Sequence, residues 1–315
     1  MPGSVILLVT SPRLPAGVLT AQAWDLVRAH PVLTASGSAF GSSQVDALRA
    51  AGASVTVVEP TVDVLLDALA EHGTFVWLAS PDGDEDLARS LGLRLAREPG
   101  LADLELLYGS WDPPGARVLD AVTVMDRLMH PETGDAWKRA QTHASLAPFL
   151  LEESYELYDA IRDEDLDAVR EELGDVLLQV VLHARLAEET AGFTLDDVAG
   201  DLVDKLIRRN PHVFADTEVG GIDDIIANWE QIKQAEKSRG SAVDGVALSQ
   251  PALALVAKLL HRVARAGLTV PFTPADPLGA ALFALVVQAH ETGQDAEAAL
   301  RIAALSYMDA VRRAE

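Results

Sequence analysis

In the N-terminal third of the chain, short uninterrupted apolar runs alternate with stretches in which apolar residues recur every three or four positions. The runs predict buried parallel strands at residues 4–9, 54–59 and 74–79, with a further strand at 104–107. Helical spacing occurs at residues 19–30, 44–51 and 62–72. This alternation predicts a small α/β domain over residues 1–115, which ends in the turn sequence Asp112-Pro113-Pro114-Gly115.

From residue 116 onward the apolar pattern is helical. It predicts four helices, at residues 146–161, 166–189, 194–210 and 222–237. The third begins with a pair close to a capping box, Thr194 and Asp197, and stops at Asn210-Pro211. Because the connections are short, we expect an all-α bundle over residues 116–240.

Residues 241–315 are also expected to be helical, and they contain an echo of this bundle. The sequence Leu173-Gly174-Asp175-Val176-Leu177-Leu178 is similar to Leu278-Gly279-Ala280-Ala281-Leu282-Phe283, which lies 105 residues further on. In the echo, Ala280 stands in place of Asp175 and Pro277 in place of Glu172. We therefore predict a degenerate second copy of the helical module without its acids.

The overall charge excludes several classes of partner. The chain has 48 acidic and 25 basic residues, a formal net charge of −23. This charge argues against binding a nucleic-acid polymer or an anionic membrane surface.

The absence of cysteine excludes disulfides, thiolate metal sites and a cysteine nucleophile. The apolar run near the N-terminus is too short for a signal peptide or a membrane span, so we expect a cytoplasmic protein.

The acids are concentrated in one segment. Residues 152–175 contain eleven acidic residues and two arginines, a net charge of −9. The ordinary interpretation of such a run is a solvated helical hairpin. Two acid pairs, however, have i,i+3 spacing, which puts both members of a pair on one helix face. The pairs are Glu153 with Glu156 and Glu172 with Asp175.

These four carboxylates are expected to face one another. Measured from the predicted turn near residue 164, Glu156 and Glu172 are each eight residues away, and Glu153 and Asp175 are each eleven away. In an antiparallel hairpin the two pairs would form facing layers about 12 and 16 Å from the turn. Carboxylates packed together beside a core cannot all stay ionised without cations, and oxygen ligands suit Mg²⁺ or Mn²⁺. The spacing therefore predicts a metal site.

The acidic motif resembles a known family. Glu152-Glu153-Ser154-Tyr155-Glu156, followed by Glu171-Glu172-Leu173-Gly174-Asp175, is similar to the metal motif of MazG nucleoside triphosphate pyrophosphohydrolases. The resemblance extends to residues 137 and 141–146 upstream, and to residues 205–214, 228–230 and 233 downstream. Many members have Cys-Pro-Trp-Asp where this chain has Asp135-Ala136-Trp137-Lys138. That difference affects a local loop and leaves the metal motif intact.

The resemblance implies an all-α NTP pyrophosphatase fold and a homodimer. It also implies Mg²⁺-dependent hydrolysis of an NTP or dNTP to a monophosphate and pyrophosphate, through attack of a metal-activated water on phosphorus, with Mn²⁺ as a substitute metal. The implied metal ligands, which act in catalysis through the metal, are Glu153, Glu156, Glu172 and Asp175, and Glu152 is a candidate for positioning the attacking water. The candidate substrate contacts are Lys205, Arg208, Arg209, Trp229, Trp137 and His143.

Several of these residues also suit structural roles. Arg208 and Arg209 could cap a helix C-terminus, Trp229 lies on an apolar stripe, and a single histidine such as His143 more often fills space than binds a ligand. Two other functions stay open: a phosphoribosyl-ATP pyrophosphatase, and a non-catalytic regulatory module that binds nucleotide or metal.

The N-terminal domain resembles a tetrapyrrole methylase domain over residues 7–20 and 78–84. Methylases of that family have a glycine-rich turn after the first strand. In this chain the turn is Thr10-Ser11-Pro12-Arg13, with no glycine before Gly17, and the domain is about half as long as a full methylase. We therefore expect a remnant of the methylase fold without methyltransferase activity.

Overall fold

The computed structural model describes residues 3–35, 39–81, 83–215, 217, 219–236, 240–272 and 274–315. The chain divides into two compact units, Met1–Val198 and Ala199–Glu315. The three domains expected from the sequence, 1–115, 116–240 and 241–315, stay a prediction.

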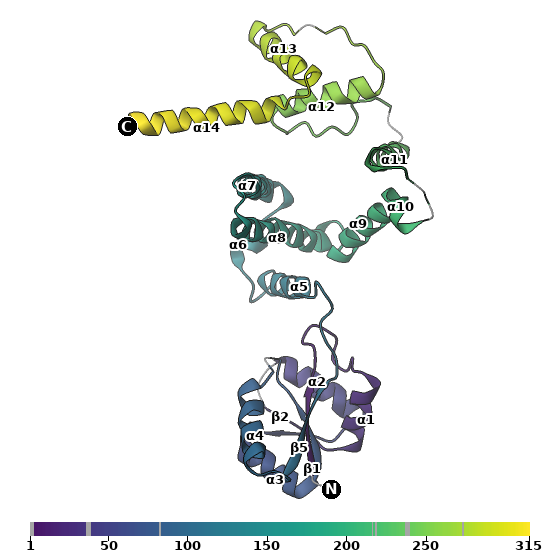
Figure 1. Cartoon of the computed structure of the whole chain (residues 1–315), viewed down its shortest axis with the longest axis vertical. Coiled ribbons are helices and arrows are strands. Elements are labelled where there is room, and N and C mark those ends of the chain that lie inside the picture. The colour runs from purple at the N-terminus through teal and green to yellow at the C-terminus, as the bar shows by residue number, and fades with distance from the viewer. Residues whose placement is uncertain are drawn as a thin grey trace. The chain divides into compact units, whose positions relative to one another are not determined.

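The first unit begins with a parallel five-stranded sheet (Figure 1). Its strands are β1 (Gly3–Val9), β2 (Val32–Ala35), β3 (Val55–Val58), β4 (Thr74–Leu78) and β5 (Ala102–Tyr108). Their order across the sheet is β3-β2-β4-β1-β5, and every pairing is parallel. The connecting helices are α1 (Ala21–Ala29), α2 (Ala39–Ala50), α3 (Val62–His72) and α4 (Glu85–Arg97).

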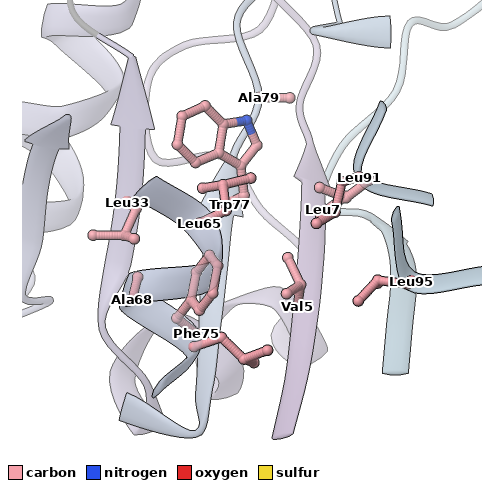
Figure 2. Close-up of a cluster of buried hydrophobic side chains, with 11 residues drawn as sticks. Val5, Leu7, Leu33, Leu65, Ala68, Phe75, Trp77, Ala79, Leu91 and Leu95 are labelled. Atoms are coloured by element: carbon pink, nitrogen blue, oxygen red, sulfur yellow. The ribbon is translucent and has the colours of Figure 1, made fainter. Parts of the chain in front are cut away.

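Both faces of the sheet are covered by helices, which explains why its central strands are apolar at successive positions. Val5 and Leu7 point into one core with Phe75 and Trp77, against buried residues of α3 and α4 (Figure 2). The residues of β1 and β4 that alternate with these pack into a second core, against buried residues of α1 and α2. The predicted α/β arrangement is therefore confirmed, whereas its likeness to a methylase stays a prediction.

The turn after β1 is held by polar contacts from the predicted linker. The Ser11 hydroxyl donates a hydrogen bond to Asp112, and Ser11 N–H donates to Ser110 Oγ at 2.9 Å. Arg13 pairs with Asp112 and, at 2.6 Å, with Asp120. These contacts fix the segment that follows β1 against the start of the helical region.

The rest of the first unit contains α5 (Arg117–Leu128), the short α6 (Ala136–Arg139), α7 (His143–Arg162), α8 (Leu166–Thr190) and the start of α9 (Leu195–Arg209). The long helices α7 and α8 form a hairpin. A cluster of buried residues joins them to α5: Met125, Met129, Leu146, Val181, Leu182 and Leu186. The predicted helices at 146–161, 166–189 and 194–210 are confirmed within a few residues.

The capping residues explain where the hairpin begins and turns. Thr142 caps α7 in a capping box with Ser145, and Asp165 caps α8 by accepting hydrogen bonds from the N–H groups of Asp167 and Ala168. Glu164, between the two helices, has a φ of 57°. The turn is therefore centred on residue 164, as the sequence predicts.

The second unit is helical. After the end of α9 it contains α10 (Pro211–Phe214), α11 (Ile222–Ala235), α12 (Ala252–Arg265), α13 (Pro277–Glu291) and α14 (Ala296–Ala314). The predicted helix at 222–237 corresponds to α11, and residue 237 lies outside the described residues. The echo at residues 278–283 lies in α13, but its interpretation as a degenerate second copy stays a prediction. Among the described residues, none of the helices is both long enough and apolar enough to span a membrane.

Candidate functional site

The acidic hairpin presents four carboxylates from two helices. Glu153 and Glu156 lie on α7, and Glu172 and Asp175 lie on α8. The turn at Glu164 lies midway between the two pairs along the chain. Because both helices rise by the same amount per residue, Glu153 is level with Asp175 and Glu156 with Glu172.

Three of these side chains converge on one point. Glu153, Glu156 and Glu172 each offer a carboxylate oxygen, and the three oxygens lie within 4.8 Å of one another. Glu153 and Glu172 are half-buried, and Glu156 is exposed. Asp175 is outside this triad, but it is half-buried and electrostatically coupled to two of its members.

The electrostatics of the hairpin reflect these matched heights. Burial raises the pKa of Glu153, and the strongest further contribution comes from the Asp175 charge. Burial also raises the pKa of Glu172, and there the strongest like-charge contribution comes from Glu156. In the part of the chain that the structure describes, no lysine or arginine forms an ion pair with any of the four acids. The acids therefore repel one another without a compensating protein cation.

This donor set fits a hard divalent cation. All of its ligand atoms are carboxylate oxygens, which Mg²⁺ and Mn²⁺ prefer. Two oxygens on opposite sides of one Mg²⁺ are about 4.2 Å apart. The triad is thus close to the size that one ion requires, and Asp175 provides a further oxygen on the same face. A cation would also offset the repulsion that, after burial, contributes to the raised pKa of Glu153 and Glu172.

The other predicted residues of the first unit lie outside the triad. Glu152 is exposed, and its charge contributes to the raised pKa of Glu153. Trp137, on α6, is 53% exposed. Its ring centroid lies 5.9 Å from that of Phe149, in an edge-to-face arrangement. The His143 ring shares a hydrogen bond with the His183 ring, at 2.7 Å between the two Nδ1 atoms. This contact gives His143 a structural partner.

In the second unit, Arg208 and Arg209 both form ion pairs with Glu236. Arg208 Nε donates to Glu236 Oε1 at 2.6 Å, and Arg209 Nη2 donates to Glu236 Oε2 at 2.5 Å. Arg209 also lies over the Trp229 ring, 5.1 Å from its centroid, and Lys233 Nζ lies 4.6 Å from the same centroid. Lys205 is half-buried on α9. The basic residues Arg208, Arg209 and Lys233, together with Trp229 and Glu236, are called the cationic cluster below.

Sequence reasoning missed two residues that contact the predicted site residues. Glu236 follows Trp229 by seven positions and Lys233 by three, so helical periodicity places it on their face. His183 follows Asp175 by eight positions, on the same side of α8. Helical spacing is the one signal that could have drawn attention to these two residues, and nothing in the sequence indicates that they pair with Arg209 and His143.

Comparison with known proteins agrees with this architecture. Residues 141–214 match the MazG family, described as the MazG nucleotide pyrophosphohydrolase domain. This segment includes the four acids and the two arginines of the cationic cluster.

Individual proteins are also similar to this chain over part of its length. An uncharacterised 26.1 kDa protein from Streptomyces cacaoi is 47% identical over 244 residues, which cover 76% of this chain and 99% of that protein. A nucleoside triphosphate pyrophosphohydrolase of Mycolicibacterium smegmatis is 47% identical over 207 residues, covering 64% of this chain but only 60% of that enzyme. A solved structure of a MazG-related protein from Thermotoga maritima aligns at 23% identity and a TM-score of 0.32, covering 36% of this chain and 96% of that one. The family match and the sequence relatives show that the chain belongs to the MazG family.

Proposed function

We propose that this protein hydrolyses nucleoside triphosphates, NTP or dNTP, to the monophosphate and pyrophosphate with Mg²⁺. The observation that carries the proposal is the group of converging carboxylates on α7 and α8, two of them with a raised pKa. The name of the Mycolicibacterium smegmatis relative supports the same activity. Because the chain matches only 60% of that enzyme's length, its activity is a proposal for this protein.

The acids account for metal binding. The cation would be coordinated by Glu153, Glu156, Glu172 and Asp175. The same oxygen donors would also coordinate Mn²⁺. When bound, the metal would polarise phosphate oxygens and lower the pKa of a coordinated water for attack on phosphorus. The Glu152 carboxylate is exposed beside the site and would accept a hydrogen bond from that water.

Basic residues of α9 would neutralise the negative charge of the substrate. A triphosphate carries about four negative charges, which a segment with a net charge of −9 would repel. Arg208, Arg209 and Lys205 would bind the phosphate oxygens. Trp229 already contacts two cations through its ring, so we propose that it acts by supporting Arg209, through a cation–π contact, and not by stacking on a base. Contacts of Trp137 and His143 with the substrate stay predictions.

The exposed apolar residues of the hairpin support a homodimer. On α7 a stripe at i, i+4 and i+7 is exposed: Leu151, Tyr155 and Tyr158. On α8 a second stripe is exposed: Leu166, Leu173, Leu177 and Val180. Large exposed apolar patches mark protein–protein interfaces. A second copy of the same hairpin would cover these stripes and complete a four-helix bundle.

The charge of the chain bears on its remaining partners. A net charge of −23 disfavours nucleic-acid polymers, while a single nucleotide neutralised by a metal ion is compatible with it. A cytoplasmic location stays part of the proposal, because nucleoside triphosphates are metabolites of that compartment.

A substrate panel tests the function. The purified chain is incubated with the ribo- and deoxyribonucleoside triphosphates and with phosphoribosyl-ATP, each with Mg²⁺, with Mn²⁺ or with EDTA, and the products are separated. We expect monophosphate and pyrophosphate from ordinary triphosphates, and none with EDTA. Turnover of phosphoribosyl-ATP alone would favour that related activity. Metal-dependent nucleotide binding without any product would favour a regulatory module.

A further inference from the structure

Glu236 lies directly after α11 and bridges two adjacent arginines. Its Oε1 accepts hydrogen bonds from Nε of Arg208 at 2.6 Å and of Arg209 at 3.2 Å. Its Oε2 accepts from Nε and Nη2 of Arg209, at 3.1 and 2.5 Å. The side chains of Glu236 and Arg209 are only 14% and 12% exposed, whereas that of Arg208 is 53% exposed. One carboxylate therefore fixes a pair of guanidinium groups in the second unit.

Glu236 binds only part of each guanidinium group, and the remaining N–H donors determine what else the two arginines can bind. It binds Arg208 through Nε alone, and Arg209 through Nε and Nη2. Both Nη atoms of Arg208 and Nη1 of Arg209 therefore lie on edges that Glu236 does not contact. A guanidinium has five N–H donors in a fixed fork, so binding at the Nε edge leaves the outer edge able to bind a second anion.

Two further contacts restrict the same group. The Arg209 guanidinium lies over the Trp229 ring at 5.1 Å, so both its face and one edge are held. The hydrogen bonds from Arg209 and Arg208 lower the pKa of Glu236 to about 2, so this carboxylate is ionised at every pH at which the protein would work. Glu236 is thus a permanent, nearly buried anion placed between two cations.

We propose that Glu236 is a positioning residue that fixes the guanidinium groups of Arg208 and Arg209 and leaves their outer N–H edges able to bind the phosphates of the nucleotide. This inference rests on the proposed function and adds a role for a residue that contacts no substrate. The arginines bind the triphosphate, and Glu236 reduces the conformational freedom that they would lose on binding.

The first test uses the full-length chain and the variant Glu236→Gln, which keeps the shape of the side chain and removes its charge. We expect KM for the nucleoside triphosphate to rise about tenfold while kcat changes less, because the lost contact orders groups that bind the substrate phosphates. Glu236→Asp, which keeps the charge, is expected to restore part of the affinity. A matched control is Glu297→Gln, which breaks an ion pair with Arg301 on α14 and should leave KM unchanged.

A double-mutant cycle separates positioning from a purely structural role. If Glu236 acts through the two arginines that it holds, adding Glu236→Gln to a variant with both Arg208→Ala and Arg209→Ala causes no further loss of affinity. Additive losses would overturn the proposal, as would a lower KM for Glu236→Gln, which would identify Glu236 as a competitor of the phosphates. If Glu236→Gln does not fold, Glu236→Ala takes its place in both measurements with the same expected results, and an unchanged KM for that variant would equally overturn the proposal. A wild-type chain that turns over no triphosphate would instead contradict the proposed function.

Discussion

Glu153 on α7 and Asp175 on α8 lie level with each other, each eleven residues from Glu164 at the centre of the turn. Asp175 is the strongest like-charge contributor to the raised pKa of Glu153, after burial itself. Two carboxylates held in this way destabilise the metal-free hairpin. The same carboxylates are therefore expected to favour activity and to lower stability. A substitution that removes one charge should change activity and melting temperature in opposite directions.

Replacing Glu153 with glutamine is expected to change stability and activity in opposite directions. The amide has the same shape and carries no charge, so the metal-free variant should melt at a higher temperature than wild type. The same change removes a metal ligand, so kcat/KM for a triphosphate should fall by at least about 100-fold. Thermal unfolding in EDTA and an assay for pyrophosphate release measure the two effects.

A matched control for this pair of measurements is Asp167→Asn. Asp167 is an exposed acid in the same hairpin and pairs with Arg170 at 3.3 Å, away from the converging carboxylates. Its replacement should leave activity unchanged and should not raise the melting temperature. A Glu153→Gln variant with full activity, or one that melts lower than wild type in EDTA, would contradict the assignment of this site.

Magnesium is expected to stabilise the protein in a pH-dependent manner. Because the folded-state pKa of Glu153 and Glu172 is raised, the folded state binds more protons than the unfolded state, and metal-free stability falls as pH rises through those values. At pH 7 a saturating metal removes this repulsion, and at 100 times its Kd it adds about 2.7 kcal/mol to the free energy of unfolding.

The pH series with and without Mg²⁺ provides the measurement. The Mg²⁺-induced rise in melting temperature should be largest near neutral pH and should shrink toward pH 4.5, where protons compete for the same oxygens. The Glu156→Ala, Glu172→Ala double variant should show no such rise. An equal rise in the double variant would mean that the metal binds elsewhere.

The acidic hairpin could be predicted from the sequence because the positions of its acids depend only on local helix geometry. The i,i+3 spacing of Glu153 with Glu156, and the symmetry about Glu164, follow from helical geometry alone. The contact between Arg209 and Glu236 joins residues 27 positions apart, so it depends on where the end of α11 lies against α9. No pattern along the chain contains that information.

The N-terminal sheet illustrates a similar limit. The apolar runs of β1 and β4 were long enough to predict, because both faces of those strands are buried. β2 (Val32–Ala35) was not predicted, since its short apolar run directly follows Pro31 and the helical pattern of residues 19–30. α4 was not predicted either, because charged residues interrupt its apolar pattern and only two of its side chains, Leu91 and Leu95, are buried.

The ion pairs of Glu236 should stabilise the fold above an identifiable pH. The pKa of Glu236 is about 2 in the folded chain, below its ordinary value of 4.5. Its stabilisation should be fully present above pH 4.5 and be lost as pH falls toward 2. Urea unfolding of wild type and Glu236→Gln between pH 2 and 7 should therefore give two stability curves that converge in acid. Curves that stay parallel down to pH 2 would show that the carboxylate charge does not matter.

The proposed homodimer should depend on the exposed stripe of α8. Leu177 is 37% exposed on this stripe, and Leu177→Glu would place a charge in an apolar interface. We expect sedimentation equilibrium to show a dimer for wild type and a monomer for this variant. Leu93→Glu is the control, since Leu93 is 58% exposed on α4, away from the hairpin. A wild-type chain that is monomeric at all concentrations would contradict the proposal.

Product analysis tests the central claim most directly. Wild type and the Glu156→Ala, Glu172→Ala double variant are incubated with ATP and Mg²⁺, and the products are resolved by ion-exchange chromatography. The account predicts AMP and pyrophosphate in equal amounts from wild type and neither product from the double variant. Release of ADP and phosphate by wild type, or undiminished formation of AMP and pyrophosphate by the double variant, would contradict it.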